Sequence, residues 1–153
     1  MHFPMFVSLE NKKCVVVGGG RIAARRVQTL SKFCEDITVI SPELCPEMEI
    51  LLKEQKITYC CRKYQHGDGK DSFLLVAATN DRTVNHQAGK EAKSFGAFVS
   101  VADCKEEGNF LFPGIAMDEK SGAVIGICTS GKSPSLAKKI TQQCRQLIKL
   151  KFR

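Results

Sequence analysis

Short apolar runs alternate with amphipathic stretches over the first two thirds of the chain. The apolar runs, such as KCVVV and FLLVAAT, are typical of buried strands in a parallel sheet. They predict strands at residues 13–17, 37–40, 57–61, 73–79 and 97–102. Hydrophobic residues at helical spacing predict helices at residues 21–33, 42–54 and 82–95. This alternation, with Ser41 and Pro42 expected at the start of the second helix, predicts an α/β fold with a Rossmann-type doubly wound parallel sheet.

The alternation ends before the last third of the chain. Two apolar stretches at residues 110–118 and 122–130 predict adjacent strands joined by a turn, and a helix follows from Ser133 to about residue 150. One stripe of this helix is apolar and holds Leu136, Ile140, Cys144 and Leu147. We therefore expect a Rossmann domain at residues 1–109 and a β-hairpin-plus-helix appendage at residues 110–153. The stripe packs either on its own domain or on a second subunit.

Charge and composition narrow the class of protein. The 153 residues carry a formal net charge of +7, which favours anionic partners such as a dinucleotide or a substrate with several carboxylates. The basic residues are scattered, and neither an aromatic platform nor a recognition helix is evident, so we expect no nucleic-acid partner. Since there is no apolar run of about 18 residues and no signal peptide, we expect no membrane association and a cytoplasmic location.

The chain has eight cysteines, but their spacing does not match a metal site. There is no CxxC pair, and no Cys/His pair stands at zinc spacing. Without a secretion signal, reduced thiols are favoured over disulfides, and buried cysteines behave as small hydrophobic residues. We therefore expect no resident metal.

The motif with the clearest chemistry is Gly18-Gly19-Gly20, which lies between the first predicted strand and the first predicted helix. It fits the pattern G-x-G-x-x-A, with Ala23 in the last position. Gly18 permits the tight turn, Gly20 lets the backbone approach a pyrophosphate, and Ala23 allows close helix–sheet packing. Free N–H groups at the helix N-terminus favour the same anion. The pattern predicts a dinucleotide site, and the alternative is a tight turn that binds nothing.

The end of the second strand lacks the acid that usually selects NAD. A Rossmann unit selective for NAD ordinarily has Asp or Glu there, hydrogen-bonded to the ribose 2′-OH. This strand ends in Ser41, so either Ser41 or Glu43 is expected near the ribose. Arg21 and Arg25 either accommodate a 2′-phosphate or face solvent. The rule therefore leaves NAD and NADP open.

Two more polar groups follow predicted strands. Thr79, Asn80 and Asp81 stand at the carboxyl end of the fourth strand, where ligands of open α/β sheets bind. Asn80 or Asp81 can equally cap the next helix. Asp103 follows the fifth strand at the same edge, where a carboxylate beside a nicotinamide ring can act as a general base. The simpler interpretation of Asp103 is a turn-forming aspartate.

Five segments resemble, in this order, one known family. They read VVVGGGRIAARRVQTL, ITVISPEL, LLVAATNDRTVN, SVADCKEEGNFLFPGIA and ICTSGKSPSLAKKI. The family is that of precorrin-2 dehydrogenase/sirohydrochlorin ferrochelatase, the N-terminal module of siroheme synthases. The resemblance spans the chain from about Phe6 to Ile148. Many families share the glycine loop, whereas AATND, VAD and TSGKSPSLA together are much more specific.

The resemblance implies that the chain oxidises precorrin-2, a tetrapyrrole, to sirohydrochlorin with NAD⁺, and that its appendage is a dimerisation region of a homodimer. Many members then insert Fe²⁺ to give siroheme. The family's essential aspartate falls on Asp103, which serves dehydrogenation and, in bifunctional members, metal insertion. The family's NAD contacts fall on Arg21, Ile22, Pro42 and Glu43. Its hydroxyl-rich loop, linked with the tetrapyrrole site, falls on Thr129, Ser130, Gly131, Lys132 and Ser133.

The sequence also departs from the family pattern. Members usually continue with a helical segment that helps cover the tetrapyrrole, whereas this sequence ends at Arg153, which leaves iron insertion open. No methyltransferase domain follows, so we expect no methylation of uroporphyrinogen. The alternative function is an NAD(H)-sensing regulatory module without catalysis. Such sensors normally carry the strand-two acid and need neither the FP hairpin nor the GKSP helix, which favours the enzyme.

Overall fold

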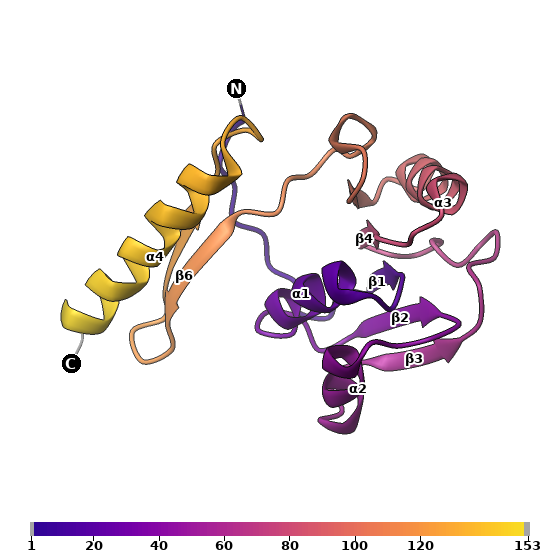
Figure 1. Cartoon of the computed structure of the whole chain (residues 1–153), viewed down its shortest axis with the longest axis horizontal. Coiled ribbons are helices and arrows are strands. Elements are labelled where there is room, and N and C mark those ends of the chain that lie inside the picture. Colours follow the sequence, from indigo (N-terminus) through magenta and orange to yellow (C-terminus); the bar gives the residue numbers. More distant parts are fainter. Residues whose placement is uncertain (1, 152–153) are drawn as a thin grey trace. The chain divides into compact units, whose positions relative to one another are not determined.

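A computed structural model, which describes residues 2–151, shows a fold built around a five-stranded parallel sheet (Figure 1). Its strands are β1 (Cys14–Val17), β2 (Ile37–Ser41), β3 (Thr58–Cys61), β4 (Leu74–Ala77) and β5 (Phe98–Val101). They lie in the order β3-β2-β1-β4-β5, and each neighbouring pair is parallel. This arrangement confirms the predicted Rossmann-type sheet.

Three helices connect these strands: α1 (Arg21–Leu30), α2 (Pro46–Lys53) and α3 (Arg82–Ser94). In α1, Ala23, Val27 and Leu30 are buried at helical spacing, so one stripe of the helix packs on the core. From β1 in the centre, β2 and β3 follow on one side, and β4 and β5 follow on the other. Because parallel crossovers are right-handed, α1 and α2 cover one face of the sheet and α3 covers the other.

The core is apolar and centred on β1 and β4. All four residues of β1 are at most 1% exposed, which explains why this strand is continuously hydrophobic rather than alternating. Leu75 of β4 is fully buried and packs with Val15, Ala92 and Val99 in one cluster under α3. Cys14 of β1 is a fully buried core residue, and this burial raises the pKa of its thiol.

The second helix begins later than predicted. Strand β2 continues to Ser41, and α2 begins at Pro46 with Cys45 as its N-cap. Ser41 is buried, and its hydroxyl donates to the Glu43 carbonyl at 2.7 Å, which makes a turn instead of a helix start. The sequence offers two candidate start signals for α2, Ser41-Pro42 and Cys45-Pro46. Only Pro46 lies in the first turn of the helix. The expectation of a helix from Ser41 and Pro42 was therefore wrong.

The chain divides into two compact units. Residues 7–110 form the sheet unit, and residues 2–6 group with residues 111–151 in the second unit. The second unit contains an antiparallel hairpin of β6 (Gly114–Asp118) and β7 (Ala123–Ile127), followed by α4 (Pro134–Lys151). This is the predicted hairpin-plus-helix arrangement, with shorter strands than expected.

Helix α4 packs on its own hairpin. A side chain at Gly114 would meet the Thr141 hydroxyl at 2.1 Å, and the Arg145 guanidinium donates to the Ile115 carbonyl at 2.8 Å. The buried stripe of α4 includes Thr141 and Ile148, whereas Leu136 and Leu147 of the predicted stripe are about half exposed. The apolar stripe is thus only partly covered within the unit.

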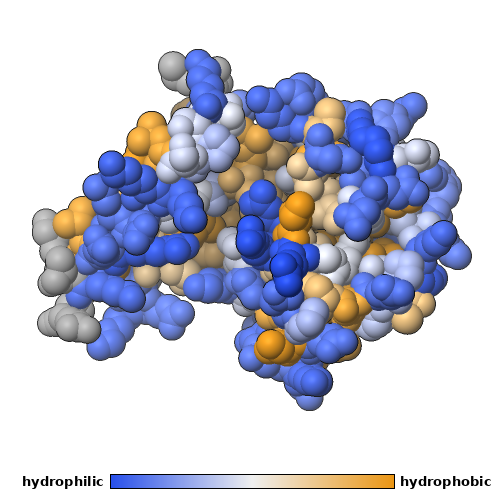
Figure 2. All heavy atoms as spheres, viewed as in Figure 1, coloured by the Kyte–Doolittle hydropathy of each residue, from blue (hydrophilic) through white to orange (hydrophobic). Residues whose placement is uncertain are grey.

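Hydrophilic side chains cover most of the face shown in Figure 2, with smaller apolar patches between them. None of the helices within residues 2–151 is long and apolar enough to cross a bilayer.

The core position of Leu75 leads to a stability prediction. Leu75→Ala is expected to lower the free energy of unfolding by about 2–5 kcal/mol, because it leaves a cavity against fully buried neighbours. A urea titration followed by circular dichroism measures the loss. Ile50→Ala in α2 is the control, since Ile50 is 55% exposed and its replacement should change the value by less than about 0.5 kcal/mol. Equal effects of the two substitutions would contradict this packing.

Candidate functional site

A cavity of about 660 Å³ lies at the carboxyl edge of the sheet. The ends of β1, β2, β3 and β4 meet there because the strands are parallel, and the loops that follow them form its walls. Its volume lies within the range of small-molecule and cofactor sites. The predicted residues that line it are Gly18, Gly19, Gly20, Ser41, Pro42, Glu43, Thr79, Asn80 and Asp81.

The first two glycines are needed where the backbone of the loop touches its neighbours. Gly18 has φ +120°, and a Cβ there would lie 2.4 Å from the Ala78 carbonyl oxygen. A Cβ on Gly19 would lie 1.9 Å from the Glu43 carbonyl oxygen. Side chains are therefore excluded from both positions by protein contacts, before any ligand is considered.

Gly20 has a different environment. A Cβ there would meet no atom within 4 Å, although Gly20 lines the cavity. It is also the N-cap of α1. The first N–H groups of a helix have no intrahelical acceptor, and here no side-chain cap accepts them either. An open approach beside such N–H groups is the geometry that binds a phosphate or pyrophosphate.

Arg21 and Ile22 are not among the residues that line the cavity, and Ile22 is 55% exposed. The Arg21 guanidinium lies 3.5 Å from Glu47 of α2, with 79% of its side chain exposed. Only the backbone N–H groups of these residues thus remain as contacts for a ligand at the helix N-terminus.

The loop after β3 adds two lining residues that sequence reasoning missed, Lys63 and Tyr64. The Tyr64 hydroxyl donates to the carboxylate of Glu91 in α3 at 2.8 Å, and Glu91 is buried. Burial, together with this hydrogen bond, raises the pKa of Tyr64 well above its usual range, so the hydroxyl stays a donor. The rule that ligands bind beyond the carboxyl ends of parallel strands could have indicated this loop.

Asp81 caps α3, which was one of the two alternatives for this residue. Its carboxylate accepts the backbone N–H groups of Thr83 at 2.9 Å and Val84 at 3.2 Å. Thr79 lies at the start of the same loop, and its hydroxyl donates to Asn85 at 2.7 Å. The cap and the threonine fix the loop after β4 against the first turn of α3.

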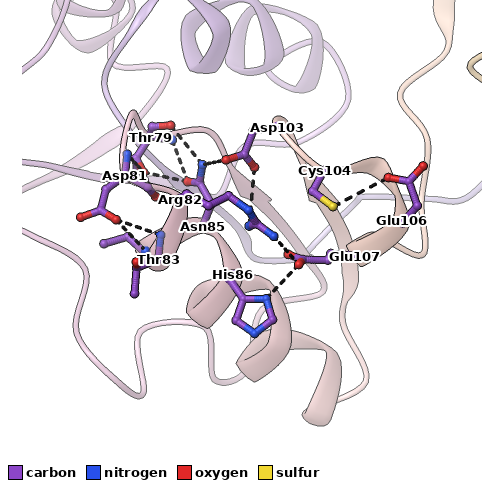
Figure 3. Close-up of polar contacts among 11 residues, drawn as sticks. Thr79, Asp81, Arg82, Thr83, Asn85, His86, Asp103, Cys104, Glu106 and Glu107 are labelled. Carbon is purple, nitrogen blue, oxygen red and sulfur yellow. Dashed lines mark hydrogen bonds and ion pairs between the residues drawn. The ribbon is translucent and has the colours of Figure 1, made fainter.

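Asp103 lies at the same sheet edge, one strand beyond Thr79, as expected for a residue that follows β5. It does not line the cavity. Figure 3 shows that its carboxylate faces Asn85 and Arg82 of α3. One oxygen accepts the Asn85 amide at 2.9 Å, and the other lies 3.9 Å from the Arg82 guanidinium. Asn85 is fully buried and was not identified from the sequence.

Arg82 is itself held by a second carboxylate, that of Glu107. The Glu107 side chain also accepts a hydrogen bond from His86 at 2.9 Å when the imidazole Nδ1 is protonated (Figure 3). Hydrogen bonds from Arg82 and then His86 lower the pKa of Glu107, so it remains ionised. Asp103 thus belongs to a polar network along one side of α3.

The hydroxyl-rich loop at residues 129–133 belongs to the second unit. The Thr129 hydroxyl bonds to the Ser133 backbone, and the Ser133 hydroxyl accepts the Leu136 N–H at 3.3 Å at the start of α4. Ser130 and Gly131 both have positive φ, so the loop is a tight turn. Among residues 2–151, no group of three or more His, Cys, Asp or Glu side chains is arranged to hold a metal ion.

Comparison with known proteins identifies relatives over almost the whole chain. Residues 5–114 match the model of an NAD(P)-binding family. The chain is 42% identical to a multifunctional siroheme biosynthesis protein of Ruminiclostridium josui and 36% identical to a siroheme synthase of Psychrobacter cryohalolentis. These matches cover 95% of this chain, which spans only 28% of the length of either relative.

Two further relatives are closer in size. The precorrin-2 dehydrogenase of Bacillus subtilis is 34% identical over 95% of this chain and 88% of its own. The solved structure of SirC, a precorrin-2 dehydrogenase, superposes with a TM-score of 0.77 at 27% identity, over 95% of this chain and 71% of that chain. The chain therefore belongs to the NAD(P)-binding family and, within it, to the group that contains precorrin-2 dehydrogenases and siroheme synthases.

Proposed function

We propose that this chain is an NAD⁺-dependent precorrin-2 dehydrogenase that converts precorrin-2 to sirohydrochlorin. The observation that carries the proposal is the placement of the Asp103 carboxylate on the same sheet edge as the dinucleotide cavity, joined to it through Asn85 and Thr79. The relationship to the Bacillus subtilis enzyme supports the choice of substrate.

The residues around the glycine loop fit a dinucleotide. The pyrophosphate lies against Gly20 and the first N–H groups of α1, where the structure leaves an open approach. The backbones of Arg21 and Ile22 contribute to this anion site, while their side chains face outward. When bound, NAD⁺ supplies the oxidising power by accepting a hydride.

Glu43 is the residue that favours NAD over NADP. It is exposed and lines the cavity just beyond the end of β2, where the adenosine ribose binds in this fold. Its carboxylate can accept the ribose 2′-OH and would repel a 2′-phosphate. Ser41 cannot offer a free hydroxyl proton, because its hydroxyl already donates to the Glu43 carbonyl.

Asp103 acts as the general base. Removal of two hydrogens from precorrin-2 releases a hydride to the cofactor and a proton, and the Asp103 carboxylate accepts that proton. Its side chain is 37% exposed, so a substrate can reach it. The net charge of +7 attracts a tetrapyrrole that carries many carboxylates. By resemblance, Thr129, Ser130, Gly131, Lys132 and Ser133 bind this substrate.

Cofactor binding is testable at Gly20. Gly20→Ala is expected to weaken NAD⁺ binding at least about 10-fold by calorimetry, because the new methyl group occupies the approach to the pyrophosphate. Unfolding stability should fall by no more than about 1 kcal/mol, since the methyl group meets no protein atom. Ser31→Ala, at the other end of α1, is the control and should bind NAD⁺ normally. An unchanged Kd for Gly20→Ala would contradict this cofactor site.

Catalysis is testable at Asp103. With precorrin-2 and NAD⁺, Asp103→Ala is expected to reduce NADH formation at least about 100-fold while the Kd for NAD⁺ changes little. Glu106→Gln, which neutralises an exposed carboxylate nearby, should retain full turnover. Undiminished turnover by Asp103→Ala would remove this residue from the mechanism. Addition of Fe²⁺ once oxidation is complete tests iron insertion as a separate step.

We further propose that the second unit forms a homodimer through the exposed part of α4. Leu136 and Leu147 are half exposed on this helix, and Phe3 and Phe6 are more exposed still. Analytical ultracentrifugation is expected to show a dimer, and Leu147→Asp should weaken it at least about 10-fold. Gln142→Asp is the control, since Gln142 is exposed and lies on a different face of the same helix from Leu136 and Leu147. A monomeric parent chain would contradict the proposal.

A further inference from the structure

The amide of Asn85 joins the cofactor edge of the sheet to Asp103. The side chain is fully buried on α3 (Figure 3). Its oxygen accepts the Thr79 N–H at 2.9 Å and the Thr79 hydroxyl at 2.7 Å. Its nitrogen donates to the Thr79 carbonyl at 3.0 Å and to Asp103 Oδ2 at 2.9 Å. Both polar atoms of one rigid amide are therefore fully used.

We propose that Asn85 is a positioning residue that fixes the Asp103 carboxylate relative to the bound dinucleotide, so that Asp103 Oδ1 is the atom that accepts the proton. This inference rests on the proposed dehydrogenase function. Thr79 lines the cavity, and Asp103 lies beside it on the next strand end. A single side chain that bonds to both sets the separation between the cofactor and the base.

The neighbours of Asp103 leave Oδ1 available. Arg82 is the cation nearest to it, and its Nη1 lies 3.9 Å from Oδ1, beyond hydrogen-bond distance. Arg82 is held there because its other terminal nitrogen bonds to Glu107, which His86 also contacts. Oδ2 is occupied by the Asn85 amide, whereas Oδ1 faces a cation without a direct hydrogen bond.

A purely structural role for Asn85 makes a different prediction. A buried amide must be hydrogen-bonded, and the three bonds to Thr79 satisfy most of that need. The fourth bond goes to a carboxylate that is 37% exposed and that water could solvate. If Asn85 only stabilises the fold, loss of this fourth bond should lower the free energy of unfolding and leave the kcat of the folded protein unchanged.

The kinetic test uses two isosteric substitutions. Asn85→Asp keeps the acceptor that faces the Thr79 N–H and hydroxyl but removes the nitrogen that donates both to the Thr79 carbonyl and to Asp103, and it is expected to lower kcat about 10- to 100-fold. The Kd for NAD⁺ should stay within about threefold of the parent value. Asn109→Asp is the control for exchanging an amide for a carboxyl, at a side chain that is exposed where Asn85 is buried. Asn109 likewise accepts a backbone N–H, from Val99, and donates to a backbone carbonyl, that of Ala97, but it does not contact Asp103.

The second test needs no substitution at Asn85 and no turnover. In ¹⁵N-labelled protein, one side-chain amide proton of Asn85 should resonate downfield, because it donates to a charged oxygen. Asp103→Ala should abolish that downfield shift and leave the Thr79 N–H in its hydrogen-bonded position. An Asn85 amide that does not respond to Asp103→Ala would overturn the inference.

The outcomes separate this inference from the proposed function. If Asp103→Ala is inactive while Asn85→Asp keeps the parent kcat, the dehydrogenase proposal stands and the role of Asn85 is wrong. Equal losses in Asn85→Asp and Asn109→Asp would likewise reduce Asn85 to a structural residue. If Asp103→Ala retains turnover, the proposed base is wrong, and the positioning role falls with it.

Discussion

The close contact of the glycine loop with two neighbouring loops is the constraint on which the site depends. The loop backbone touches the Ala78 carbonyl on one side and the Glu43 carbonyl on the other, at separations that leave no room for a Cβ. Backbone hydrogen bonds reinforce both contacts, from Ala78 N–H to the Val17 carbonyl on the first side and from Cys45 N–H to the Gly19 carbonyl on the second. Three strand ends are thereby held together beside the N-terminus of α1.

This packing assigns different roles to three adjacent glycines. Gly18 and Gly19 are required by the protein itself, whereas Gly20 has open space where its side chain would be. A serine or aspartate N-cap would stabilise α1 slightly more than Gly20 does, and no protein contact excludes such a side chain. Gly20 is therefore the glycine that the proposed dinucleotide site accounts for and protein packing does not.

Local patterns in the sequence predicted the sheet, the glycine turn and the edge on which Asp103 lies, because each depends on short-range periodicity and parallel strand geometry. They did not predict the start of α2, since two proline signals compete there. Nor did they predict Asn85 or Tyr64. Asn85 lies within a helix six residues from Thr79, and Tyr64 meets Glu91 across 27 residues. Such contacts exist only after the helix has docked on the sheet.

Helix α3 organises the half of the site that the glycine loop does not reach. Asp81 caps its first turn, Asn85 in the next turn holds Thr79 and Asp103, and Glu91 near its end binds Tyr64. Side chains on a packed helix keep their positions better than side chains on loops, so the loops after β3 and β4 gain rigidity from their contacts with α3. The buried polar residues of this helix are then explained by what they hold, because an isolated buried Asn or Glu would destabilise the fold. The cofactor edge and the carboxylate after β5 are thus parts of one structure, built on the N-terminus of α1 and on one side of α3.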